Sequence, residues 1–264
     1  MLTIERYIRA KSLEEAYTLC HQKNTVILGG MLWLRMQNRT IDTAVDLCDL
    51  GLDTITEDDS AFHLGAMVTL RQMETHPGLN RLTQGAMGDC LRPIVGVQFR
   101  NLATVGGSLY GKFGFSDVLT LFLALDARVH LYRQGLISLR EFAEKRMEPD
   151  ILVEVIVPKT PVRAVYLSQR NTATDFPTLT CALAIREGET VCAIGARPQR
   201  AVLLRDERGI LRNGITEESA RAFGEDVAAR TAFGSNLRCS ADYRKTVCPV
   251  LVRRGLMKLK EGME

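Results

Sequence analysis

Two glycine pairs are the residues of this chain whose type and spacing could do chemistry. The first closes the apolar stretch Val26-Ile27-Leu28-Gly29-Gly30, and the second lies within Ala103-Thr104-Val105-Gly106-Gly107-Ser108. Glycine allows a positive φ and lacks the Cβ that would hold a phosphate away from backbone N–H groups. Two such turns facing one ligand could bind a diphosphate. The pair of motifs therefore indicates a dinucleotide site, although a single glycine pair is ordinarily only a turn.

Other familiar catalytic patterns are absent from the sequence. It contains no GxGxxG motif of a Rossmann NAD site, no GxxxxGK[ST] phosphate loop and no GxSxG nucleophile elbow. The histidines form no HxxH or HExxH pair, and no two cysteines form a CxxC pair. Asp117 could act as an acid, but beside Ser116 it is more simply read as part of a helix N-terminus. We therefore predict neither catalytic side chains nor a metal held by this chain.

Length and composition exclude several classes of protein. The chain has 264 residues, 46% hydrophobic and 25% charged, which is typical of a globular protein with one large or two modest domains. The net charge of +3 and the lack of a basic tract argue against nucleic acid or a membrane surface as partners. Without a signal peptide or a long apolar segment, a cytoplasmic location is expected. The seven scattered cysteines argue against a disulfide framework or an iron–sulfur site.

The elements that position the first glycine pair are predicted to alternate between strand and helix. Ser12-Leu13-Glu14-Glu15 is a capping box that begins a short amphipathic helix. Thr69 is expected to cap another short helix, which ends at Pro77-Gly78. Strands are expected at residues 25–28, 43–47 and 62–66, and a helical segment at Met31–Gln37. This alternation is typical of an α/β unit.

The second half of the chain predicts a different arrangement. Ser116 and Asp117 begin a predicted helix at 118–125, and a composition shift at Pro158–Pro161 predicts a domain boundary. Strands are expected at 127–132 and 151–157, a β-hairpin at 178–186 and 190–196, and helices at 216–231 and 241–260. We therefore expect an α+β fold, in which α/β subdomains precede an antiparallel sheet covered by helices.

Around its glycine pairs the sequence resembles the flavin subunits of the molybdenum hydroxylases, which include xanthine dehydrogenase and the aerobic carbon monoxide dehydrogenases. Residues 26–33 are similar to the first FAD loop of that family. Residues 99–109, followed by Ser116-Asp117, are similar to its second loop, RN-x-A-T-[IV]-G-G-[NS]-[IL] … SD. Three later stretches resemble its C-terminal signatures: Asp175-Phe176-Pro177, Gly195-Ala196-Arg197-Pro198 with Arg200, and Arg238–Arg244. The resemblance covers essentially the whole chain in order.

The resemblance implies a vanillyl-alcohol-oxidase-type (PCMH-type) FAD-binding domain at residues 1–160, with subdomains at about 1–56 and 57–160. A C-terminal α+β domain would occupy residues 161–264. FAD would lie extended between the two subdomains, with its diphosphate on the backbone N–H groups of the two loops. The implied cofactor-binding residues are Val26, Ile27, Leu28, Gly29, Gly30, Met31, Leu32, Trp33, Ile94, Thr104, Val105, Gly106, Gly107, Ser108, Asp117, Ile151, Leu152 and Arg170.

Individual roles also follow from the resemblance. The aspartate that matches Asp117 hydrogen-bonds the ribityl or adenosine side of FAD in the family. Ile94 falls where the family places an apolar or aromatic residue near the isoalloxazine, and Ile151 or Leu152 would lie beside the cofactor. The family lysine near the flavin N1–C2 edge aligns with Leu167, and Arg170 is near enough to replace it. A cation at that edge would stabilise the anionic reduced flavin.

The sequence departs from the family pattern at both loops. The first loop usually reads Gly-Gly-Thr-Asp-Leu, whereas here Gly30 is followed by Met31-Leu32-Trp33, so a hydroxyl and a carboxylate are missing. The usual Ser-Pro of the second loop is replaced by Phe113-Gly114. Because phosphate binding rests mostly on backbone groups, FAD affinity could survive these changes, whereas the tuning of the flavin is less secure.

The function implied is that of a flavoprotein oxidoreductase subunit in a heteromeric, xanthine dehydrogenase-like complex. Electrons would pass from the [2Fe–2S] clusters of a partner chain through FAD to NAD or another acceptor. Molybdopterin would be held by a further partner subunit, because this chain has neither cluster ligands nor anything that resembles a molybdopterin subunit. The contribution of this chain would be positioning and electrostatics, and purine oxidation of the xanthine type is the first expectation for the complex.

Two alternatives remain open at this point. The chain could be a non-catalytic scaffold subunit of the same fold that binds FAD weakly or not at all, because Met31, Leu32 and Leu167 replace polar residues of the family. It could also be a stand-alone flavin oxidase that reacts directly with oxygen. The absence of any constellation that could serve as a substrate base argues against the second alternative.

Overall fold

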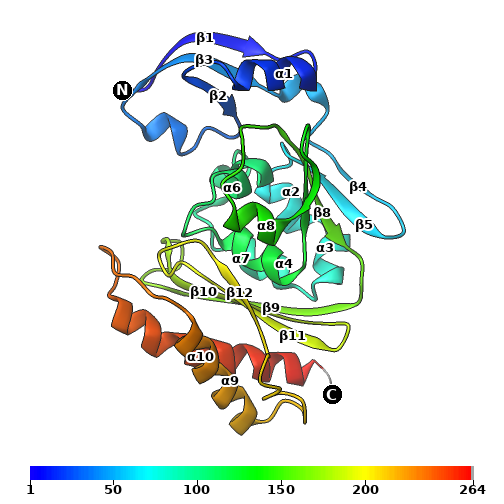
Figure 1. Cartoon of the computed structure of the whole chain (residues 1–264), viewed down its shortest axis with the longest axis vertical. Helices are drawn as coiled ribbons and strands as arrows, with labels where there is room; N and C mark the ends of the chain where they lie inside the picture. Colours follow the sequence, from blue (N-terminus) through cyan, green and yellow to red (C-terminus); the bar gives the residue numbers. More distant parts are fainter. Residues whose placement is uncertain (263–264) are drawn as a thin grey trace. The chain divides into compact units, whose positions relative to one another are not determined.

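The computed structural model of the chain describes residues 1–262 and contains two compact units (Figure 1). Unit 1 comprises residues 1–73, 97–111 and 127–158. Unit 2 comprises residues 74–96 and 112–126 and the chain from Lys159 onward. Each unit is therefore assembled from three separate stretches of sequence. The division of the chain into domains at about residue 160 stays a prediction.

The first sheet of unit 1 is parallel and carries the first glycine pair. Its order is β1-β3-β2, with bounds Thr3–Arg9, Thr40–Asp46 and Thr25–Leu28. Helix α1 (Leu13–Cys20) connects β1 to β2, and its N-cap Ser12 accepts a hydrogen bond from the N–H of Glu15, as the capping box predicts. The carboxyl ends of parallel strands share one edge of a sheet, which is where ligands bind in open α/β sheets. Gly29 and Gly30 follow β2 at that edge.

The second sheet of unit 1 is antiparallel and lies in the order β4-β5-β8-β6-β7. The bounds of these strands are Ile55–Glu57, Ala61–Gly65, Leu152–Pro158, Arg128–Leu131 and Gly135–Ser138. Burial alternates along the central strand β8, where Val155 and Val157 are fully buried. This period of two is typical of a sheet with one covered face.

Short helices complete unit 1 and carry the second glycine pair. These segments are η1 (Leu34–Met36), η2 (Cys48–Leu50), α5 (Val97–Arg100), α6 (Val105–Tyr110) and α8 (Leu139–Glu144), and α2 (Leu70–Thr75) begins in this unit. Thr104 is the N-cap of α6, and its hydroxyl accepts a hydrogen bond from the N–H of Gly107 at 3.1 Å. The glycine pair therefore forms the first turn of a helix.

An ionic and aromatic cluster links helix α1 to the turn between β6 and β7. The guanidinium of Arg133 lies 5.2 Å from the ring centroid of Tyr17 and 5.0 Å from that of Tyr132. Arg133 and the Tyr132 hydroxyl both donate to the carboxylate of Glu14. These contacts tie the two sheets of unit 1 together.

The sheet of unit 2 is a four-stranded antiparallel meander in the order β12-β11-β10-β9. Its strands are β9 (Val162–Arg170), β10 (Pro177–Arg186), β11 (Glu189–Gly195) and β12 (Val202–Arg205). The hairpin of β10 and β11 pairs Arg186 with Glu189, close to the predicted turn. Nearly every residue of β10 is buried, so both faces of the sheet are covered.

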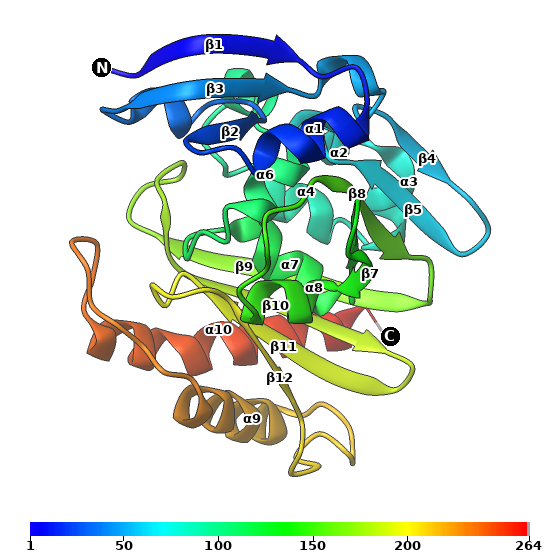
Figure 2. The ribbon, with the colours of Figure 1, turned by 45° about the horizontal axis from the view of Figure 1, so that its top comes forward.

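Helices cover the two faces of this sheet, as Figure 2 shows. Helices α9 (Glu217–Arg230) and α10 (Ala241–Glu261) pack against one face through a core that includes Phe223, Cys248 and Leu256. Helices α4 (Ala86–Leu91) and α7 (Asp117–Ala124) contact the strands from the other face, with α3 (Pro77–Leu82) beside α4. All eight residues of α7 are buried, as expected for a helix that is apolar on every side. The predicted α+β fold with a helix-covered antiparallel sheet is confirmed.

The structure corrects several predictions of local structure. Residues 31–37 do not form a helix: only η1 is helical there, because Met31 takes a left-handed backbone conformation with a φ of +58°. Helix α2 ends at Thr75, close to the predicted end at Pro77-Gly78, but Pro77 itself begins α3, where its missing N–H costs nothing. Strands β1, β4, β7, β9 and β12 were not predicted. Within residues 1–262, no helix combines the length and apolar character that crossing a membrane requires.

The buried side chain of Arg244 holds the start of α10 against the sheet of unit 2. Arg244 is 1% exposed, and its guanidinium donates only to oxygens of the chain itself. The acceptors are the carbonyls of Thr178, Ala196, Gly234 and Cys239 and the Oδ1 of Asn236, at 2.7 to 3.0 Å. A buried cation is tolerated because its donors are satisfied.

Replacing Arg244 by methionine should lower the free energy of unfolding by at least about 3 kcal/mol, because each buried acceptor left without a donor costs about 1–3 kcal/mol. Urea denaturation followed by circular dichroism measures this loss. Arg254→Met is the matched control, since Arg254 lies exposed on the same helix. Equal stability of the two variants would contradict a structural role for the buried guanidinium.

Candidate functional site

The first glycine loop lies at the carboxyl edge of the parallel sheet in unit 1. Val26, Ile27 and Leu28 belong to strand β2, whose last residue is opposite Asp46 of β3. Leu28 is 3% exposed, so it anchors the strand in the core. Gly29 and Gly30 therefore leave the sheet at the edge where a ligand can be reached.

The two glycine loops pack directly against each other. A Cβ built on Gly29 would lie 2.8 Å from the Oγ1 of Thr104 and 3.7 Å from the Cα of Gly107. A Cβ on Gly30 would overlap the backbone carbonyl of Leu102. Only glycine fits at these two positions, because any Cβ would overlap atoms of the segment that leads into the second loop or of that loop itself. The structure thus brings together both motifs that the sequence singled out.

The N–H groups of the second loop are already engaged within the chain. Their acceptors are the carbonyl of Val68 for Val105, the carbonyl of Ala66 for Gly106, the Thr104 Oγ1 for Gly107 and the Thr104 carbonyl for Ser108, at 2.8 to 3.1 Å. The Ser108 hydroxyl also donates to the Thr104 carbonyl at 2.8 Å. This loop is therefore held in one conformation by hydrogen bonds to Thr104 and to the backbone of residues 66–68.

The N–H groups of the first loop are not engaged in this way. The N–H groups of Gly30, Met31 and Leu32 donate to no acceptor within residues 1–262. Met31 takes a left-handed conformation here, and successive N–H groups beside such a residue can form a concave anion-binding site called a nest. Leu32 is buried and holds the turn to the core. The diphosphate of a dinucleotide fits these residues, because they offer neutral donors and no opposing carboxylate.

A second group of predicted residues forms a buried polar cluster in unit 2. Asp117, at the start of α7, accepts hydrogen bonds from the hydroxyl of Tyr166 and from the guanidinium of Arg170. The side chains of Asp117 and Arg170 are each 7% exposed. Arg170 also donates to the Ser168 hydroxyl at 3.1 Å and to the Asp175 carbonyl at 2.5 Å. Three further groups, from Tyr166, Ser168 and Asp175, therefore hold the pair in place.

Burial controls the ionisation of this cluster. It raises the pKa of Asp117 to about 6, although Arg170 and Tyr166 oppose the rise by stabilising the carboxylate. It also raises the pKa of the Tyr166 hydroxyl well above its usual range, so Tyr166 remains a hydrogen-bond donor at neutral pH. Asp117 can therefore gain or lose a proton at a pH near neutrality, while strand β9 keeps Tyr166 and Arg170 in place around it.

Leu167 and Arg170 both belong to strand β9, but their side chains lie on opposite faces of it. Leu167 packs into the core beneath α9 and α10, whereas Tyr166 and Arg170 point to the face that carries Asp117. Side chains alternate along a strand, so only residues of the same parity as Tyr166 reach this cluster. Tyr166 itself was missed from the sequence, although its spacing of four from Arg170 could have revealed it.

The remaining predicted residues lie in or near the cores of their units. Ile151 is 1% exposed and belongs to a cluster with Ala10 and Val45, and Leu152 begins the buried strand β8. Ile94, in unit 2, is half-buried after α4. Their expected contacts with the cofactor stay predictions. Within residues 1–262, no three His, Cys, Asp or Glu side chains are grouped so as to hold a metal ion.

Comparison with known proteins identifies the family of this chain. Residues 2–160 match the model of the FAD binding domain in molybdopterin dehydrogenase. The chain belongs to this family. The predicted recognition is confirmed, and because dehydrogenases are oxidoreductases, so is the expectation of an oxidoreductase subunit. The match contains both glycine loops.

Individual relatives agree with this assignment. The nicotinate dehydrogenase FAD-subunit of Eubacterium barkeri is 32% identical over 133 residues, which is 47% of this chain and 45% of that protein. The carbon monoxide dehydrogenase medium chain of Hydrogenophaga pseudoflava is 24% identical over an alignment of 275 residues, which covers 95% of this chain and 95% of that protein. A solved carbon monoxide dehydrogenase from the same organism superposes with a TM-score of 0.86 at 21% identity, covering 96% of this chain and 97% of that chain. The last comparison shows a common fold.

The contact between the loops predicts a sharp difference between two glycines of this FAD binding domain. Gly30→Ala should lower the free energy of unfolding by about 3 kcal/mol, because its Cβ meets a backbone carbonyl that cannot move aside. Gly107→Ala should change it by less than about 1 kcal/mol, because its Cβ meets only the Thr104 Oγ1, at 3.1 Å. Urea denaturation measures both, and similar losses would show that the loops are not in contact.

The raised pKa of Asp117 predicts a pH dependence of stability. Between its ordinary value of 3.8 and about 6, the folded chain binds a proton that the unfolded chain releases. The stability that Asp117 contributes is thus greatest below pH 3.8 and falls by roughly 3 kcal/mol as the pH rises to about 6. The free energy of unfolding of the wild type minus that of Asp117→Asn should decrease over this interval. A difference that grows with pH would mean that the Arg170 ion pair outweighs burial.

Proposed function

We propose that this chain is the FAD-binding subunit of a molybdenum hydroxylase-type complex. It passes electrons from the [2Fe–2S] clusters of a partner chain through FAD to NAD or another acceptor. The observation that carries this proposal is the contact of the two glycine loops, with free N–H groups on Gly30, Met31 and Leu32. A rigid nest of neutral donors beside a glycine helix turn suits a diphosphate.

The division of work between the loops follows from their hydrogen bonds. The first loop donates to the diphosphate, and the second supports it from behind while Gly107 leaves its outer side open. When bound, FAD takes up electrons singly and releases a pair as a hydride. The chain has no side-chain acid or base to contribute at the loops, so its task there is to position the cofactor.

Arg170 is the proposed cation beside the flavin. Its charge is balanced by Asp117, so it acts as one half of a buried ion pair and not as an isolated positive charge. As the pH falls below about 6, protonation of Asp117 removes this balance and leaves Arg170 a stronger electrostatic stabiliser of an anion. Asp117 is in this way a positioning residue for Arg170.

Partners and compartment belong to the same proposal. The relatives include a chain named the medium chain of carbon monoxide dehydrogenase, and the solved carbon monoxide dehydrogenase is described as lacking the Mo-pyranopterin moiety of its molybdenum cofactor. We extend this to a molybdopterin-binding subunit and a [2Fe–2S] subunit as partners, in the cytoplasm, with xanthine-type purine oxidation as the first candidate reaction. A scaffold subunit without FAD is the second candidate, favoured by the apolar side chains of Met31, Leu32 and Leu167.

Gly107→Val tests the proposed function. The purified chain should retain a yellow flavin chromophore through dialysis and should bind FAD in a titration. The variant should bind at least about tenfold more weakly, because a branched side chain closes the open side of the second loop to phosphate. Its thermal unfolding and circular dichroism should stay close to those of the wild type. A colourless wild type that takes up no FAD would establish the scaffold instead.

A further inference from the structure

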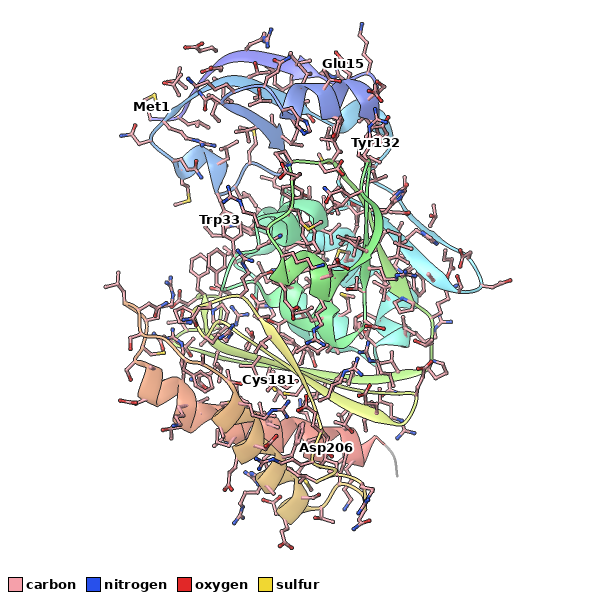
Figure 3. The ribbon with its side chains drawn as sticks, in the orientation of Figure 1. Met1, Glu15, Trp33, Tyr132, Cys181 and Asp206 are labelled. Atoms are coloured by element: carbon pink, nitrogen blue, oxygen red, sulfur yellow. The ribbon has the colours of Figure 1, made fainter. Side chains whose placement is uncertain are left out.

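The first loop ends in an aromatic residue that is half-buried and held by the second loop. Trp33 is the only tryptophan of the chain, and Figure 3 labels it where the loop leaves the parallel sheet. Its ring lies 5.8 Å from the ring of Phe99, at an interplanar angle of 61°, as in an edge-to-face pair. Phe99 belongs to α5, which leads into the second loop.

The backbone gives this ring pair little freedom. The Phe99 carbonyl accepts hydrogen bonds from the N–H groups of Leu102 at 3.0 Å and Ala103 at 2.9 Å. The carbonyl of Leu102 in turn lies against Gly30, three residues before Trp33. The indole is thus fixed to the same backbone contact that forms the nest, and Leu32, next to it, is anchored in the core.

Exposed apolar side chains lie close to Trp33 and Phe99 in the sequence. Val97 is 43% exposed, Leu102 is 50% exposed and Met36 is 75% exposed. Apolar side chains that accompany a few polar donors are typical of a ligand site. A ligand that joins an anionic group to a flat apolar ring has the chemistry that matches this combination.

We propose that Trp33, supported by Phe99, stacks on one of the two ring systems of the dinucleotide whose diphosphate lies in the nest. This inference rests on the proposed function. The threonine and aspartate that are usual in this loop of the family are absent here. The rings of Trp33 and Phe99 offer stacking in place of those polar contacts. Trp33 is then an affinity- and specificity-determining residue of the first loop.

Two variants of Trp33 separate stacking from loop shape. Trp33→Leu should weaken FAD binding about tenfold, which corresponds to about 1.4 kcal/mol, within the range measured for a base on an aromatic ring. Trp33→Phe should lose no more than about threefold, because it keeps a ring. Equilibrium dialysis with detection of flavin absorbance gives each dissociation constant. Tyr7→Leu, at an exposed aromatic residue of β1, is the matched control and should leave binding unchanged.

Competition against FAD identifies what the ring touches. Inorganic pyrophosphate has no ring, so its affinity should be the same in the wild type and in Trp33→Leu. A loss confined to ADP assigns the stack to adenine, and a loss confined to FMN assigns it to the isoalloxazine; either outcome supports the proposal. Unchanged FAD binding in Trp33→Leu, or an equal loss for pyrophosphate, would overturn it, because the indole would then only shape the loop. A wild type that binds no FAD would refute the proposed function as well.

Discussion

The close approach of two backbone segments is the constraint on which the site depends. Gly30 lies against the carbonyl of Leu102, and Gly29 lies against Thr104, at distances that exclude any Cβ. This contact joins a loop that follows a parallel strand to a loop that begins a helix, about 70 residues later in the chain. The unpaired N–H groups and Trp33 lie in the chain directly beside this contact.

The two units differ in the polar groups that they place at their proposed sites. The nest of unit 1 offers neutral N–H dipoles and carries no ionised side chain of its own, so an anion bound there meets no fixed countercharge. Unit 2 buries whole charges, and two of them have well-defined partners: Arg170 is balanced by Asp117, and Arg244 donates to carbonyl and amide oxygens. Buried charges without such partners would cost several kcal/mol. The ion pair of Asp117 and Arg170 is the one whose balance changes near neutral pH.

Much of the fold follows from local sequence patterns. The capping residues Ser12, Ser116 and Ser240 mark helix starts because their side chains satisfy N–H groups within the next turn. The hairpin of β10 and β11 follows from two apolar runs and a short polar turn. Patterns failed where backbone conformation depended on distant neighbours. The apolar residues after Gly30 read as a helix, but Met31 takes a left-handed conformation at the contact with the second loop.

The sequence alone determined the family, the two glycine motifs and the pairing of Asp117 with a helix start, because each depends on residues close together in the chain. Only the tertiary structure decided which of the two glycine motifs has N–H groups available to a ligand. It showed that the N–H groups of Val105 to Ser108 donate to Val68, Ala66 and Thr104, whereas those of Gly30 to Leu32 donate to no acceptor within residues 1–262. It also placed Leu167 and Arg170 on opposite faces of β9. Hydrogen-bond partners and strand faces are set by long-range packing, which local patterns do not encode.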